Sequence, residues 1–150
     1  MEQIKPGVPA VQSDGHPPGD GRAAPGVFPI LPEEIDFYEG EVKRFRAGQA
    51  DPQAFRAFRL KHGVYGQRQP GVQMFRIKIP YGRMTPSQLE AVGQVAQRYS
   101  ETGRGHVTTR ENIQLHFTSL DDTAEMMRIL GDAGLTTREA CGNTVRNVTG

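Results

Sequence analysis

The sequence predicts an α+β fold in which helices cover one face of a small sheet. Apolar and polar residues alternate in the stretch VQMFRIKIP (residues 72–80), as in a strand with one buried face. A helical spacing of apolar residues follows directly after a capping signal at residues 85–88. Over about residues 72–137, segments of these two kinds occur in the order strand, helix, strand, strand, helix, strand. This order is that of the ferredoxin-like split βαβ (β-α-β-β-α-β) unit.

Before this unit, residues 1–31 are rich in proline and glycine and have no apolar periodicity. Such a segment buries too little apolar surface to offset the entropy of ordering the chain. We therefore expect residues 1–31 to form a disordered leader.

Residues 32–63 predict a helical arm of two short helices. The first begins at Pro32, since proline suits the first helical turn, and ends near Gly48. The second begins at Asp51 and Pro52, an N-cap followed by proline, and ends at Gly63. The apolar residues of the arm recur at helical spacing: Ile35, Tyr38, Val42 and Phe45 in the first helix, and Phe55 and Phe58 in the second.

The predicted ferredoxin-like half domain spans residues 64–137. Its first helix begins with the capping box Thr85-Pro86-Ser87-Gln88 and runs to about Thr102. Its apolar face consists of Leu89, Val92, Ala96 and Tyr99.

A predicted hairpin follows this helix. Its strands cover residues 107–109 and 113–117, and a tight turn at Arg110 and Glu111 joins them. The next helix follows Ser119 and ends at Gly134, where a left-handed C-terminal cap is expected. Its inward residues are Ala124, Met127 and Leu130, and residues 135–137 complete the unit as a fourth strand.

Strand alternation predicts which side chains face away from the helices. On the last hairpin strand Ile113, Leu115 and Phe117 point inward, so Gln114 and His116 point to the open face. The same period assigns Arg76, Lys78, His106, Thr108 and Asn112 to this face. A polar face can simply contact water, or its cations can bind an anion. Periodicity alone does not separate these two interpretations.

Composition excludes several classes of protein. The 150 residues carry 18 Lys+Arg and 17 Asp+Glu, a balance that argues against a dedicated nucleic-acid-binding protein. There is no apolar run of the length that crosses a membrane and no secretory signal, so we expect a cytoplasmic protein without a membrane partner. Cys141 is the single cysteine, which leaves no multi-cysteine metal site within these residues.

Three strings resemble the sirohaem-dependent nitrite and sulfite reductases. They are FRIKIPYGRMTPSQLEAVGQVA (residues 75–96), TTRENIQLHF (residues 108–117) and ACGNTVRNVTG (residues 140–150). They occur in the family's order on the strand–helix–hairpin plan, and the resemblance runs from about residue 35 to 150.

The resemblance implies an oxidoreductase that reduces nitrite to ammonia or sulfite to sulfide with six electrons from ferredoxin or a flavoprotein. The implied cofactors are sirohaem and a [4Fe-4S] cluster bridged to it through a cysteine sulfur. Sirohaem carries eight carboxylates, for which guanidinium groups are suitable partners. The residues implied at the sirohaem are Arg110, Gln114, His116, His106, Thr108 and Asn143. Those implied at the substrate anion are Arg76 and Arg146.

The family's cluster cysteines and its paired lysines have no counterpart in this sequence. We therefore expect an amino-terminal piece of such an enzyme, with residues 138–150 starting the sirohaem and cluster domain. It would turn over only with the remainder of its own polypeptide. The alternatives are a stand-alone ferredoxin-like module that binds RNA or a small anion, and a remnant without chemistry. The predicted open face lacks the stacking aromatics of RNA-binding sheets, which counts against RNA.

Cys141 has two main interpretations. It can be a small buried apolar residue without further function. Alternatively, some branches of the family join a tyrosine and a cysteine beside the haem, and Tyr65 and Cys141 resemble that pair. The sequence does not decide between nitrite and sulfite, and it does not give the oligomeric state.

Overall fold

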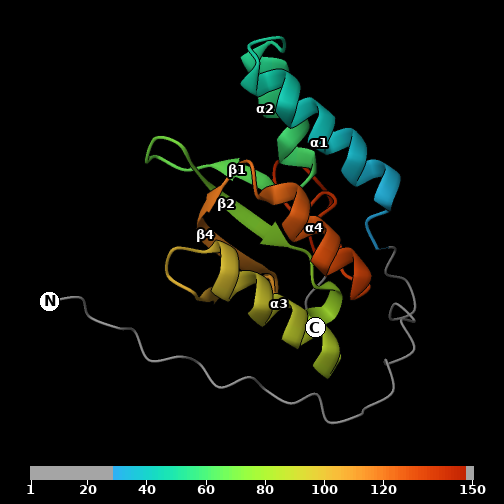
Figure 1. The fold of residues 1–150 in the computed structure, drawn as a ribbon. Helices are drawn as coiled ribbons and strands as arrows, with labels where there is room; N and C mark the ends of the chain where they lie inside the picture. Colours follow the sequence, from blue (N-terminus) through green and yellow to red (C-terminus); the bar gives the residue numbers. More distant parts are fainter. Residues whose placement is uncertain (1–28, 148–150) are drawn as a thin grey trace, which may run out of the picture.

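The computed structural model describes residues 29–147 (Figure 1). Nearly all of the predicted leader, and residues 148–150 of the predicted final segment, lie outside the described residues. The helices are α1 (Pro32–Arg46), α2 (Pro52–Lys61), the short 3-10 turn η1 (Pro80–Gly82), α3 (Pro86–Tyr99) and α4 (Thr123–Asp132). The strands are β1 (Val64–Gly66), β2 (Val72–Ile77), β3 (Gly105–Val107) and β4 (Ile113–Ser119). They form one antiparallel sheet in the order β1-β2-β4-β3, which confirms the α+β class.

The core lies between the sheet and the helices. Phe75 and Ile77 of β2 and Leu115 of β4 are fully buried. They belong to one apolar cluster with residues of α3 and α4, namely Val92, Val95, Met126, Met127 and Leu130. Because the helices occupy this face, Arg76 of β2 and Gln114 and His116 of β4 lie on the opposite face of the sheet.

The two predicted arm helices form where their capping residues indicate. The Asp51 carboxylate accepts a hydrogen bond from the Ala54 amide at 2.7 Å and so caps α2. Helix α1 lies alongside α4 (Figure 1), and the Tyr38 hydroxyl lies 3.0 Å from Thr123 Oγ1. The arm therefore contributes to the main core, with Ile35, Tyr38, Val42 and Phe55 in the same apolar cluster.

The prediction of a fourth strand over residues 135–137 is wrong. Within residues 135–137 only one bridge forms, between Thr136 and Lys78. The sequence did not predict β1, which occupies the edge beside β2 with Val64 opposite Phe75. Because β1 already pairs along most of this edge of β2, the later segment reaches only the residue after its end.

Two side chains predicted to be inward lie elsewhere. Phe117 has a positive φ of 58° at a register shift, so the alternation breaks and the fully buried residue is Thr118. Leu89 is 56% exposed, because the buried face of α3 starts at Gln88, which is 4% exposed.

The hairpin strand β3 also begins earlier than predicted, since Thr108 already belongs to the turn. Its hydroxyl accepts hydrogen bonds from the amides of Arg110 and Asn112. Among residues 29–147, no helix combines the length and the apolar character needed to cross a membrane.

Candidate functional site

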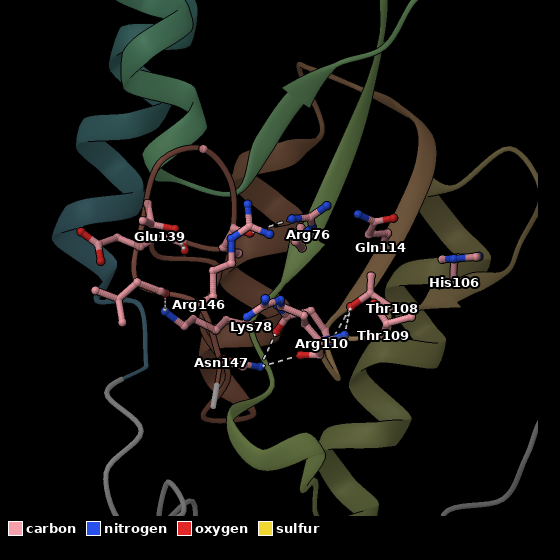
Figure 2. Close-up of a pocket in the computed structure, with 15 residues that line it drawn as sticks. Arg76, Lys78, His106, Thr108, Thr109, Arg110, Gln114, Glu139, Arg146 and Asn147 are labelled. Carbon is pink, nitrogen blue, oxygen red and sulfur yellow. Dashed lines mark hydrogen bonds between the residues drawn. The ribbon is translucent and has the colours of Figure 1, made fainter. Parts of the chain in front are cut away.

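A hollow of about 360 Å³ opens on the face of the sheet that the helices leave free (Figure 2). We call it the cationic hollow. The residues that line it come from β2, from the β3–β4 hairpin and from the segment after α4. They are Arg76, Lys78, His106, Thr108, Thr109, Arg110, Asn112, Gln114, Glu139, Ala140, Gly142, Thr144, Val145, Arg146 and Asn147.

The floor of the hollow is a row of polar side chains across three strands. Arg76 on β2 is opposite Gln114 on β4, and Gln114 is opposite His106 on β3. With its amide oxygen turned toward Arg76, Gln114 accepts hydrogen bonds from Nε at 2.9 Å and from Nη2. Gln114 thereby fixes the position of the Arg76 guanidinium.

One wall of the hollow is the segment 139–147. Two cations, Arg76 on β2 and Lys78 just after it, connect this segment to the sheet. Arg76 Nη1 donates to the Ala140 carbonyl at 3.2 Å, and Lys78 Nζ donates to the Val145 carbonyl at 3.2 Å. These contacts bring Arg146 over the strand residues, as Figure 2 shows.

The opposite wall is the turn between β3 and β4. Glu111 has a positive φ of 63°, which gives this turn its tight form and leaves Arg110 exposed at its tip. The Asn147 side chain donates to the Arg110 carbonyl at 3.1 Å, so the turn and the segment 139–147 are joined.

The hollow concentrates positive charge in a chain whose formal net charge is only +1. Four cationic side chains line it, against the single carboxylate of Glu139. Guanidinium groups present paired N–H donors that match the geometry of carboxylates and oxyanions. The arrangement therefore suits an anion with several acceptor oxygens.

A second hollow of about 430 Å³ adjoins the first and shares Gln114 with it. His116 and Tyr65 line this second hollow. Burial lowers the pKa of His116, and the neighbouring His106 and Arg76 lower it further. His116 is therefore a neutral imidazole at pH 7 and adds hydrogen-bonding capacity without charge.

The structure brings together most of the residues that the sequence analysis selected. Six of them line the cationic hollow: Arg76, His106, Thr108, Arg110, Gln114 and Arg146. Asn143 lies exposed in the segment 139–147 and lines neither hollow. Cys141 is only 3% exposed, and burial raises the pKa of its thiol. The roles assigned to all of these residues stay predictions, as does the link between Cys141 and Tyr65.

The residues that line the hollow but were not predicted for the site include Lys78, Asn112, Glu139 and Asn147. Strand alternation had already placed Lys78 and Asn112 on the correct face, so that signal was present. Glu139 and Asn147 line the hollow only because the segment after α4 folds back over the sheet, and no periodicity in the sequence indicates such a path.

Among residues 29–147, no three His, Cys, Asp or Glu side chains are grouped so that they could hold a metal ion.

Comparison with known proteins agrees with this architecture. Residues 65–133 match the family model described as the nitrite/sulfite reductase ferredoxin-like half domain. The chain is 39% identical over 80 residues to a ferredoxin–nitrite reductase of Leptolyngbya laminosa, a match that covers 53% of this chain and 16% of that protein. It is 39% identical over 99 residues to an assimilatory ferredoxin-dependent nitrite reductase of Haloferax mediterranei, covering 59% of this chain and 17% of that protein.

A sulfite reductase (ferredoxin) of Mycobacterium tuberculosis is 31% identical over 77 residues, covering 51% of this chain and 14% of that protein. The matched regions thus span about one sixth of the length of these curated relatives.

The solved structure of the Mycobacterium tuberculosis NirA protein shares the fold, with a TM-score of 0.62 and 23% identity over 73% of this chain and 23% of that chain. Residues 65–133 are therefore the ferredoxin-like half domain of the nitrite and sulfite reductases.

Proposed function

We propose that this chain supplies the anion-binding part of a sirohaem-dependent reductase that converts nitrite to ammonia or sulfite to sulfide. The observation that carries the proposal is the convergence of Arg76, Arg110, Gln114 and Arg146 on one hollow. These residues come from two strands, a turn and a distant segment, so a shared location is not a consequence of sequence proximity.

The side chains of the hollow fit a polycarboxylate such as sirohaem. Guanidinium, amide and hydroxyl groups are hydrogen-bond donors, and Arg110, Gln114 and Thr108 present one of each. His106 lines the same hollow and His116 the adjoining one, and both would contact a group that extends over the two hollows. Asn143 would contact the edge of such a group.

When bound, sirohaem and its [4Fe-4S] cluster supply the electrons that reduce the substrate. Residues outside this sequence would hold the cluster, because Cys141 is the single cysteine here. The named relatives use ferredoxin as electron donor, and we propose ferredoxin or a flavoprotein as the donor for this enzyme.

Arg76 and Arg146 would bind the substrate oxyanion. An arginine keeps its proton at any physiological pH, so these side chains act as fixed hydrogen-bond donors and positive charges rather than as proton donors. Their charge would stabilise oxygen atoms that gain negative charge as their bonds to nitrogen or sulfur weaken. Nitrite and sulfite both offer such oxygens, so the hollow suits either substrate.

The test is Arg146→Ala in the full-length protein. Because Arg146 would contact the substrate, turnover of nitrite or sulfite should fall by about a hundredfold while sirohaem content stays near that of the wild type. Sirohaem content is measured by absorbance and turnover with reduced ferredoxin. Arg56→Ala is the control, since Arg56 is an exposed arginine of α2 outside both hollows.

Equal turnover in Arg146→Ala at matched sirohaem content would refute the role of Arg146. A full-length protein that binds sulfite but contains no sirohaem would instead favour the anion-binding module without catalysis.

A further inference from the structure

The cations of the hollow sit on separate segments, and one buried side chain connects three of these segments. Asn147 is 8% exposed, and its Nδ2 group lies close to three acceptors. These are the Ile79 carbonyl at 2.8 Å, the Asn112 Oδ1 atom at 2.8 Å and the Arg110 carbonyl at 3.1 Å. Figure 2 shows Asn147 at the lower end of the hollow, with a hydrogen bond to the turn that carries Arg110.

The backbone explains why asparagine side chains are needed at this point. β2 ends at Ile77, so Ile79 has no strand partner, although it is 1% exposed. Its carbonyl accepts a hydrogen bond from the Gly82 amide at 3.1 Å in the turn η1. Asn112 Oδ1 accepts a hydrogen bond from the Ile79 amide at 3.0 Å, and Asn147 Nδ2 donates to the Ile79 carbonyl. Asn112 thus pairs the buried amide in place of a strand, since buried backbone polar groups must be paired. Asn147 adds a second donor to the carbonyl and so ties its own segment to Ile79.

Each contact of this pair lies at or next to a cation. Ile79 follows Lys78, Asn147 follows Arg146, and Arg110 is itself the residue whose carbonyl is held. We infer that Asn147, acting with Asn112, is a positioning residue that sets the spacing of Lys78, Arg110 and Arg146 around the bound anion. This inference rests on the proposed function for the identity of the anion.

The geometry makes the two asparagines unequal. Asn147 acts as a donor through Nδ2, whereas Asn112 acts in this pair as an acceptor through Oδ1. Aspartate keeps the acceptor oxygen and removes the donor. Asn112→Asp should therefore preserve the pair, and Asn147→Asp should place an oxygen against three acceptor oxygens.

These two variants are matched controls for each other. Each adds one negative charge without changing side-chain size, and the substituted atoms belong to neighbouring side chains in the same hollow. A difference between them therefore reports the lost donor and not the added charge.

The experiment uses the full-length holoprotein and two readouts. Hydrogen–deuterium exchange of the segments around residues 78–84 and 106–113 should be faster by about tenfold to a hundredfold in Asn147→Asp than in Asn112→Asp. The KM for nitrite or sulfite should rise by about tenfold in Asn147→Asp, with a smaller change in kcat, because the cations lose their spacing before chemistry begins.

Equal behaviour of the two variants in either readout would overturn the inference. Faster exchange with an unchanged KM would also overturn it, since the pair would then hold the backbone without positioning the cations. If Asn147→Asp fails to fold, Asn147→Ser is compared with the wild type instead, because the shorter serine hydroxyl reaches fewer of the three acceptors and adds no charge.

Failure of the proposed function is recognised separately. In that case the wild-type protein reduces neither anion, and calorimetric binding of sulfite replaces KM as the second readout. The exchange comparison and this affinity then still decide whether Asn147 positions the cations.

Discussion

Gly63 shows how one residue allows the edge of the sheet to close around Arg76. It has a positive φ of 79°, and its carbonyl accepts a hydrogen bond from the Arg76 amide at 2.8 Å. A Cβ atom at this position would lie 2.7 Å from the Arg76 carbonyl oxygen and 2.8 Å from that of Thr137. Both contacts are with backbone atoms, which cannot rotate away. Only glycine therefore lets both segments approach the strand that carries Arg76.

Gly63→Ala should destabilise the protein through both conformation and contact. Gly71 is a matched control, because it has a φ of 81° and open space where its Cβ would be. Gly71→Ala should cost about 1 kcal/mol in the free energy of unfolding, and Gly63→Ala about 3 kcal/mol, since only the latter adds steric overlap. Urea unfolding measures both. Equal losses would show that the backbone around Gly63 relaxes freely.

At the scale of elements, α1 is joined to α4 by a buried chain of hydroxyl groups. Thr123 Oγ1 donates to the Leu120 carbonyl at 2.6 Å, so the Tyr38 hydroxyl is the donor in its own bond to Thr123 Oγ1. Burial raises the pKa of Tyr38 to about 12. The phenol is thus held in its neutral form where α1 packs against α4.

This arrangement predicts a specific loss of stability at high pH. The ordinary pKa is 10.0, so above it the unfolded chain releases the Tyr38 proton while the folded chain keeps it until about 12. The stabilising contribution is complete below pH 10.0 and is lost as the pH rises toward 12, by up to about 3 kcal/mol.

Tyr38→Phe should cost about 1 kcal/mol at neutral pH through the lost hydrogen bond, and should then lose less stability than the wild type on going above pH 10. Urea unfolding across this range measures the difference. Tyr81→Phe is the control, because Tyr81 is 73% exposed and its hydroxyl is not part of the core. Parallel curves for Tyr38→Phe and wild type would contradict a raised pKa.

The elements that sequence predicts well are those with local signals. Asp51 before Pro52, and the capping box at Thr85, start helices where the structure has them, because a cap depends on residues within one turn. β1 has only three residues and forms because α2 and β2 hold it, so no local pattern reveals it. The sequence does not predict the bulge at Phe117 either, since the bulge depends on the register between β4 and β2.

The candidate site divides in the same way. Arg76, Gln114 and His106 were predicted on one face, and strand pairing places them in one row, because alternation along a strand fixes direction. Arg146 was selected only through the family resemblance. Its place beside the others depends on hydrogen bonds from Arg76 and Lys78 to the backbone of residues 140 and 145, which are contacts between distant parts of the chain.

At the scale of the whole molecule, charge is nearly balanced but unevenly distributed. On the far side of the core, acidic and basic residues are paired, as in the contacts of Arg128 with Asp36 and Glu39. In the cationic hollow, by contrast, four cations face one carboxylate. Such a grouping is unfavourable in the absence of an anion, because like charges repel each other in a confined space. The grouping of charges that favours anion binding in the hollow therefore lowers the stability of the ligand-free protein.

The effect of removing one of these charges on the free energy of unfolding should therefore change sign when an anion is bound. In the ligand-free protein at low salt, Arg110→Gln should increase the free energy of unfolding by about 0.5 kcal/mol, since it removes one of the repelling charges. The gain should disappear in high salt, where screening acts within a few ångströms. Arg56→Gln, a change in an exposed arginine outside the hollow, should alter stability much less under either condition.

Adding the polycarboxylate mellitate should make the wild type more stable than Arg110→Gln, because the wild type binds it more tightly and is stabilised more. A loss of stability in ligand-free Arg110→Gln at low salt would mean that Arg110 stabilises the fold. It would contradict the interpretation of the hollow as an anion-binding site.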